Sequence, residues 1–403
     1  MSKRRLRHIS DMSRRGGRRL GRCLRGGAAV GEEAMTASGR AEQAGEVFSG
    51  LAEMSPAYFG LVMATGIISL AAFMMQHDTI ALGLFYLNIG QYAVLCVLYA
   101  LRAWHYPRRF FGDMVAHLTG PGYFTTVAGT GILASQFMVL RENIVVGKAL
   151  WMLAILLWVC LTYTIFTAFT VRREKPTLDE GINGGWLLAV VATQALSVSS
   201  ALLAARIDQP FRLELNLVAL SMWLWGGMLY IWMMSLIFYR YAFFRFSPGD
   251  LAPPYWINMG AMAISTLAGS LLILNAPHAP YLMSLLPFLK GFTVFYWATG
   301  TWWIPMLLLL AIWRYGYERF PFRYDPLYWG AVFPLGMYAA STWQMDHAME
   351  FGFLTPLPRA FLYIALSAWA ITFFGMLRGL VRVLNSKRAC STSPQRDGDT
   401  RKK

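Results

Sequence analysis

The chain contains about ten apolar stretches between residues 56 and 382, and each is long enough to cross a lipid bilayer as a helix. Charged residues are almost absent from these stretches. Only 14% of all residues are charged and 56% are hydrophobic, whereas a soluble domain usually carries about 25% charged residues. The pattern predicts an all-α polytopic membrane protein, whose function must be one that a lipid-embedded helix bundle can perform.

The net charge of +15 could indicate binding to nucleic acid, but the placement of the basic residues favours a membrane topology signal. Eleven Lys or Arg lie within residues 1–50, and most others lie in short loops. The even-numbered loops and both termini are basic, and we assign Arg102, Arg240 and Arg314 to these loops. By the positive-inside rule, both termini are cytoplasmic, which requires an even number of helices and agrees with ten. We expect a multi-pass protein of the cell (plasma or inner) membrane, with no nucleic-acid partner.

Three regions follow from composition. Residues 1–53 form a basic tail that we expect to be disordered, because it has no apolar segment with which to build a core. An alternative is a translation start at Met35 or Met54. Residues 54–384 form a ten-helix transmembrane transport domain, and residues 385–403 form a polar tail.

The apolar stretches are of two alternating kinds. The odd-numbered ones begin near residues 56, 115, 182, 255 and 327, with Pro or Gly at the start and Gly, Ser and Thr inside. The even-numbered ones are mostly richer in Leu, Trp, Met and Phe. The repeat of roughly 60 to 70 residues predicts five hairpins around a central pore, each with one inner and one outer helix. Small residues also serve plain helix packing, which is the alternative for any one of them.

Three segments resemble a known family. The run from Pro56 to Ser69 is similar to the first helix of the tellurite-resistance/dicarboxylate transporter family, to which plant slow anion channels, fungal malate permeases and sulfite efflux pumps belong. The run from Tyr328 to Gly336, with Phe333-Pro334, resembles its ninth helix, and Pro254 to Gly260 its seventh.

The resemblance implies ten helices as five hairpins around a pseudo-five-fold axis, with odd helices lining the pore. It also implies a homotrimer with one pore per subunit, and a Phe that plugs the pore and corresponds to Phe333. Two departures concern the substrate. Ala64 stands where the family often has Gly, and His117 is followed by Leu118, where the family often has Pro.

These patterns give three groups of candidate site residues. Phe333 and Pro334 form the gate, since a bulky ring blocks a narrow channel and Pro permits a local bend. The candidates for the pore wall have small or hydroxyl side chains; they are Thr65, Gly66, Gly129, Thr130, Thr193, Ser265 and Thr266. The candidates for the cytoplasmic mouth can attract anions; they are His117, Arg108, Arg172 and Arg323. Packing, for the first two groups, and topology, for the arginines, are the alternative explanations.

The sequence shows no constellation typical of a membrane enzyme, so we expect neither catalysis nor a cofactor nor a metal site. Three hypotheses remain: a passive anion channel, a proton-coupled anion carrier or exporter, and a scaffold or receptor. The shortage of Asp, Glu and His in the apolar stretches disfavours the carrier, because proton coupling usually needs such residues. The expected partners are membrane lipid and a small anion, for example malate, succinate, sulfite, nitrate, chloride or a tellurite-related oxyanion.

Overall fold

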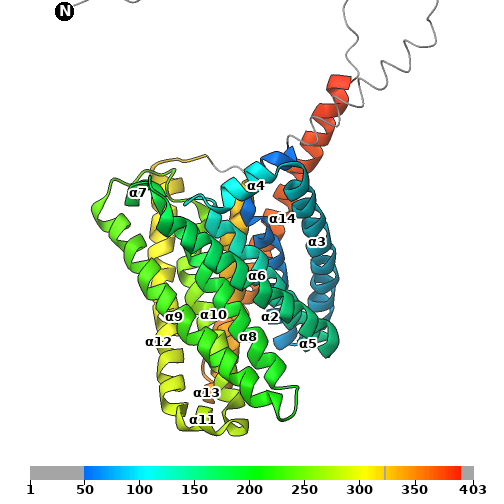
Figure 1. Ribbon diagram of the computed structural model, residues 1–403, viewed down its shortest axis with the longest axis vertical. Helices are drawn as coiled ribbons and strands as arrows, with labels where there is room; N and C mark the ends of the chain where they lie inside the picture. The colour runs from blue at the N-terminus through cyan, green and yellow to red at the C-terminus, as the bar shows by residue number, and fades with distance from the viewer. Residues whose placement is uncertain (1–49, 322–323, 392–403) are drawn as a thin grey trace, which may run out of the picture. The chain divides into compact units, whose positions relative to one another are not determined.

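The computed structural model describes residues 50–321 and 324–391, with side chains described up to residue 382. Within these residues every regular element is helical. The long helices run roughly from one end of the bundle to the other (Figure 1). The predicted basic tail lies almost entirely outside the described residues.

Five hairpins make up the bundle. Each begins with a short 3-10 turn that leads directly into an inner helix, and an outer helix returns. The turns are η1 (Pro56–Phe59), η2 (Gly120–Tyr123), η3 (Gly184–Leu187), η4 (Pro253–Trp256) and η7 (Pro326–Tyr328). The inner helices are α2 (Gly60–Met74), α5 (Phe124–Leu140), α8 (Leu188–Ala204), α10 (Ile257–Asn275) and α13 (Trp329–Met349). The outer helices are α3 (Asp78–His105), α6 (Ile144–Val171), α9 (Phe211–Phe243), α12 (Leu286–Ala311) and α14 (Pro356–Ser391).

Short elements connect the hairpins. Helix α4 (Pro107–Met114) and helix α7 (Leu178–Gly181) lie at the end of the bundle where the inner helices begin, and α11 (Pro280–Ser284) lies at the other end (Figure 1). A 3-10 turn, η5 (Ala276–His278), precedes α11, and a π-helical turn, η6 (Ile312–Tyr317), ends α12.

Local sequence explains where the inner helices begin. Proline stands in the first turn of η1, η2, η4 and η7, where its missing N–H costs no hydrogen bond. Three of the five starts also carry a side-chain cap: Ser55 accepts from the Ala57 N–H at 3.3 Å, Asn183 from Gly185 at 2.8 Å, and Asp325 from Leu327 at 2.8 Å.

The inner helices form a closed ring. Neighbours in this ring pack in the order α2, α5, α8, α10, α13 and back to α2. In the apolar windows of the first four inner helices 78–94% of residues are buried, against 17–50% in the outer helices. In α13, fourteen of 21 residues are buried. The predicted alternation of inner and outer helices is therefore confirmed.

The helix count agrees with the prediction of ten. Among the described residues, nine helices are long and apolar enough to cross a membrane. Helix α13 is the tenth; it has 21 residues but carries more polar side chains, with Ser341, Thr342, Gln344 and Asp346 in its second half.

The structure differs from the sequence-based boundaries at two places. Helix α14 continues to Ser391, into the predicted polar tail 385–403, because no Gly or Pro interrupts residues 380–391. Arg102, Arg240 and Arg314 were assigned to loops, but they lie in helical turns and are buried, with 1%, 7% and 7% of their surface exposed.

Candidate functional site

The five 3-10 turns meet at one end of the bundle. Each touches the next, in the order η1, η2, η3, η4, η7 and back to η1. Glycine permits the closest approach: a Cβ on Gly184 would lie 2.7 Å from the Pro254 carbonyl oxygen, and one on Gly122 would lie 3.2 Å from the Ala57 nitrogen. This ring of turns encloses the end of the bundle axis.

A cavity of about 190 Å³, which we call the mouth, lies within the ring of turns. All five hairpins contribute to its lining, with Ala57, Gly122, Gly184, Pro254 and Leu327 among the residues. Among the residues that the structure describes, no Lys, Arg, Asp or Glu lines it. Since five helices begin here, their unpaired backbone N–H groups and the positive ends of their dipoles gather at the mouth. An uncharged surface of this kind attracts anions without holding them by a fixed charge.

The mouth narrows one helical turn further in. A second cavity of only about 20 Å³, the constriction, shares Ala57, Leu188, Pro254 and Leu327 with the mouth and is lined from all five inner helices. Phe333 lines the constriction and is 1% exposed. A space of this size holds about one water molecule. The space beside Phe333 is therefore too small for a hydrated anion.

Pro334 lies beside the constriction, on the side of α10. A Cβ on Gly260 would lie 2.7 Å from the Pro334 Cγ, so this glycine allows the proline ring to pack against α10. Because Pro334 has no N–H, α13 lacks one backbone hydrogen bond in the turn that carries Phe333. The local chain can bend there at lower cost than elsewhere in α13.

Several predicted pore-wall residues contact the outer helices. Thr65, Thr130 and Thr193 are buried, and each hydroxyl is hydrogen-bonded to an aromatic side chain of an outer helix. A Cβ on Gly66 would meet Ile132 at 2.6 Å, and one on Gly129 would meet Phe59 at 3.4 Å. The Ser265 and Thr266 hydroxyls donate to carbonyl oxygens of their own helix. Their place in the pore wall stays a prediction.

The hydrogen bonds of these hydroxyl residues belong to a pattern that repeats five times. Each outer helix forms a hydrogen bond from an aromatic side chain to the inner helix of the next hairpin, at 2.8–3.1 Å. Helix α6 forms a second one, from Trp151 to Ser200. The bonds join Tyr92 and Thr130, Trp158 and Thr193, Trp223 and the Ser265 carbonyl, Trp297 and Thr342, and Trp369 and Thr65. The pattern is cyclic, since the last bond closes α14 onto α2. Sequence reasoning missed it, although an aromatic in every outer helix was a visible signal.

We expect Trp158→Phe to lower the free energy of unfolding by about 1 kcal/mol, because it removes one buried hydrogen bond and keeps most of the ring. Thr193→Val should have the same effect, and the double variant should cost no more than either single variant. The measurement is the thermal midpoint of the purified protein. Thr170→Val, at an exposed position of α6, is the control. A change of anion flux in Thr193→Val alone would instead assign its hydroxyl to the pore wall.

None of the charged mouth candidates that the structure describes, His117, Arg108 and Arg172, lines the mouth. His117 stacks on Phe169 with ring centroids 4.2 Å apart, in a cavity shared with Arg172, Lys175 and Glu180. Burial, Arg172 and Lys175 lower the pKa of His117, so its imidazole is uncharged at pH 7. Arg172 and Arg108 are exposed. Leu118 borders both this cavity and the mouth. Arg323 lies outside the described residues.

Two buried arginines join outer helices to the turns near the mouth. Arg102 pairs with Asp113 and donates to the Tyr123 hydroxyl at 3.3 Å. Arg240 likewise lies 3.4 Å from Asp250 and donates to Tyr255 at 2.5 Å. Both tyrosines belong to the turns of the ring, so each arginine ties an outer helix to the next turn. Burial tends to raise the pKa of Asp250, but hydrogen bonds from Ser247 and the charge of Arg240 hold it below its ordinary value.

Comparison with known proteins gives the family. Residues 53–377 match the family described as voltage-dependent anion channel, which is most of the chain. The chain belongs to this family. The match covers every hairpin, so the ring of turns and the mouth are parts of the family domain. The resemblance seen in three sequence segments is thereby confirmed.

Individual relatives agree with this family. An uncharacterized transporter of Methanocaldococcus jannaschii, MJ0762, is 25% identical over 337 residues, which cover 81% of this chain and 93% of the relative. A second uncharacterized transporter of that organism, MJ0576, is 24% identical over 322 residues, or 79% of this chain and 90% of the relative. An uncharacterized membrane protein of Mycobacterium tuberculosis, Rv1735c, is 36% identical over 156 residues, or 39% of this chain and 79% of the relative. The chain is thus a multi-pass membrane protein of a transporter family. Among the described residues, no group of three or more His, Cys, Asp or Glu could hold a metal ion.

Proposed function

We propose that this protein conducts small anions passively through the centre of the inner ring, with Phe333 and Pro334 as its gate. One observation carries the proposal: five helix N-termini converge on an uncharged mouth that ends at the Phe333 ring. The helix ends draw anions to the mouth, and the aromatic ring closes the path behind it.

The proposed substrates are small anions, C4-dicarboxylates or related oxyanions. Conduction requires binding that is favourable enough for the ion to enter and weak enough for it to leave. Backbone N–H groups meet this requirement better than a fixed arginine would. Two arginines that contact the ring of turns, Arg102 and Arg240, are already engaged with Asp113 and Asp250. They hold the turns in place and leave the mouth free of fixed charge.

A proton-coupled carrier is the alternative. Coupling needs a residue that binds protons within the path. Helices α2, α5, α8 and α10 contain no Asp, Glu, His, Lys or Arg. In α13 these residues are confined to Asp346 and His347 in its last turn, where Asp346 accepts hydrogen bonds from Leu354 and Thr355. This distribution favours passive permeation.

The assembly and orientation remain proposals. We propose a homotrimer with one pore per subunit, on the strength of the family resemblance. The basic loops support an orientation with both termini, and therefore the mouth, on the cytoplasmic side of the plasma or inner membrane. Dicarboxylate transport and tellurite resistance are likewise proposals that rest on the family resemblance.

Flux measurements in proteoliposomes test the mechanism. We expect radiolabelled anion uptake to follow the anion's own electrochemical gradient and to persist after a protonophore collapses the proton gradient. A panel of chloride, nitrate, sulfite and malate, each tested separately, identifies the substrate. Protein-free liposomes are the control. Uptake that stops when the proton gradient collapses would support the carrier in place of the channel.

A further inference from the structure

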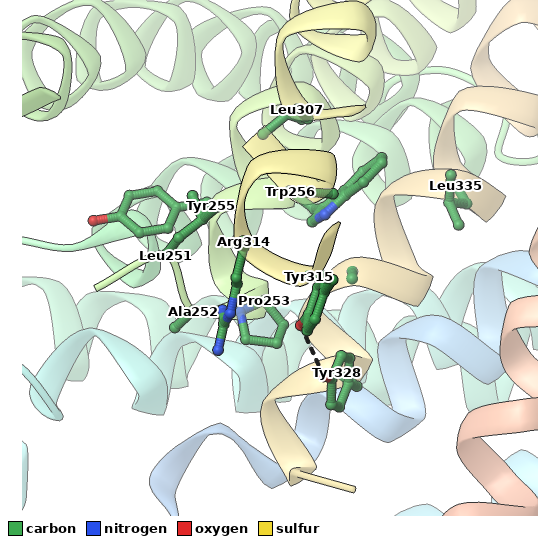
Figure 2. A pocket seen from close by; sticks show the side chains of 12 residues that line it. Leu251, Ala252, Pro253, Tyr255, Trp256, Leu307, Arg314, Tyr315, Tyr328 and Leu335 are labelled. Carbon is green, nitrogen blue, oxygen red and sulfur yellow. Dashed lines mark hydrogen bonds between the residues drawn. The ribbon is translucent and has the colours of Figure 1, made fainter. Parts of the chain in front are cut away.

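A separate cavity of about 200 Å³ lies outside the inner ring, at the end of α12 (Figure 2). It is bordered by η4, by the π-helical turn η6 and by the first turns of α13. Ala331 and Leu335 of α13 line it and lie on one helix face, being four residues apart. Phe333 stands midway between them in sequence and faces the opposite way, into the constriction. The cavity is therefore not part of the proposed anion path.

Arg314 is the charged residue of this cavity, as Figure 2 shows. Only 7% of its surface is exposed, and its Nε is buried without a hydrogen-bond partner. The guanidinium lies over the ring of Phe320 at 4.2 Å and over that of Tyr315 at 5.2 Å. Within residues 50–321 and 324–391, no carboxylate forms an ion pair with it. In this part of the chain no Asp or Glu lines the cavity either.

Comparison with Arg240 shows what Arg314 lacks. Both arginines lie near the end of an outer helix, and each has a phenylalanine under its guanidinium six residues later, Phe246 and Phe320. Four residues after Phe246 stands Asp250, the acidic partner of Arg240. Four residues after Phe320 stands Tyr324 instead. The next residue, Asp325, accepts a hydrogen bond from the Leu327 N–H at 2.8 Å, and no ion pair joins it to Arg314 among the described residues. Arg314 thus keeps the aromatic support but has no acidic partner there.

A buried cation without an anion is unfavourable, because the aromatic faces replace only part of its hydration. An anionic ligand in the adjoining cavity would supply the missing partner. Arg314 lies in a π-helical turn, and such turns are frequent at functional sites, which supports a ligand site here.

The rest of the lining indicates the kind of ligand. Apart from Arg314 it consists of aliphatic, proline and aromatic side chains, including Leu307, Trp256 and the hydrogen-bonded pair of Tyr315 and Tyr328. Such walls suit a hydrocarbon body next to an oxyanion head. Arg314 also lies near the end of the apolar segment Leu286–Tyr317. Basic side chains near the ends of such segments commonly reach the lipid headgroups.

We propose that this cavity binds the phosphate group of an anionic membrane lipid, with Arg314 as its cationic partner. A free phosphate ion has the same head chemistry but cannot use the apolar walls, so the lipid is the favoured source. This cavity shares Ala252 and Tyr255 with the mouth, but Arg314 and the α12 and α13 residues that carry the proposal line neither the mouth nor the constriction.

Native mass spectrometry of the full chain in detergent tests the proposal. Phosphatidylglycerol is titrated against phosphatidylcholine with the same acyl chains, and inorganic phosphate is added as a competitor. We expect tight retention of phosphatidylglycerol by the parent and a loss of affinity of roughly tenfold or more in Arg314→Met, the size expected for a hydrogen bond to a charged group. Inorganic phosphate should not displace the lipid.

Two further variants keep the test decisive. Ala331→Leu retains Arg314 but fills the cavity, and it should weaken lipid binding as well. Arg109→Met removes an exposed arginine near the same end of the bundle and should leave binding unchanged. Equal binding by the parent, Arg314→Met and Ala331→Leu would overturn the proposal, as would equal retention of phosphatidylcholine. Displacement by inorganic phosphate would overturn the lipid as the source.

Discussion

Phe333→Ala should increase anion conductance roughly a hundredfold, because it removes the ring that closes the constriction. A gate that loses about 3 kcal/mol of its preference for the closed state opens about a hundred times more often. Phe333→Leu should give a smaller increase, since its side chain still fills part of the space. The measurement is anion flux in proteoliposomes or whole-cell current, normalised to assembled protein.

A matched buried phenylalanine separates gating from general damage. Phe124 is also 1% exposed on an inner helix, but its ring lies 6.1 Å from Phe166 of the outer helix α6 and lines neither the mouth nor the constriction. Phe124→Ala should lower stability, by about 3–5 kcal/mol for a core ring, without raising the flux per folded molecule. If correctly assembled Phe333→Ala conducts no more than the parent, Phe333 is not the gate.

Gly184→Ala should disrupt the ring of turns. Its new methyl group would lie 2.7 Å from the Pro254 carbonyl oxygen and 2.9 Å from the Tyr255 Cα. Both are backbone atoms, so no side-chain rotation relieves the clash and η3 must move away from η4. We expect a loss of about 1–3 kcal/mol in the free energy of unfolding and altered flux through the mouth. Thermal unfolding followed by size-exclusion chromatography measures the first, and proteoliposome flux the second.

Two other glycines serve as controls for this substitution. A Cβ on Gly330 would lie 3.4 Å from the same Pro254, which is ordinary contact, so Gly330→Ala should fold normally. A Cβ on Gly90 of the outer helix α3 meets nothing within 4 Å, and Gly90→Ala should stabilise the helix slightly. Gly330 lines the constriction, so its variant is a control for stability only. If Gly184→Ala matches both controls in stability and Gly90→Ala in flux, the turns do not need this close contact.

The sequence determined the helices and their alternation. Three features of the fold follow from local properties, namely segment length, apolar content and helix-starting residues. They are the ten membrane crossings, the start of each inner helix near a Pro or Gly, and the division into inner and outer helices. These properties do not depend on which neighbour a helix later contacts. The family resemblance likewise rested on short runs such as Pro56 to Ser69, and the match over residues 53–377 confirms it.

The tertiary structure decided which way the side chains of the inner helices face. Helix α2 is apolar nearly all round, so no polar stripe marks a face toward the axis. Helix α8 does carry a polar stripe, but Thr193, Ser197 and Ser200 form hydrogen bonds with the outer helices α6 and α9. Thr65 and Thr193 could therefore be proposed for the pore wall, although their hydroxyls bind the outer helices. For a related reason, the sequence did not predict that Arg240 and Arg314 are buried. Positive charge near a helix end is a topology signal in any membrane protein. Only the tertiary structure shows that Arg240 pairs with Asp250 and that Arg314 lines a cavity.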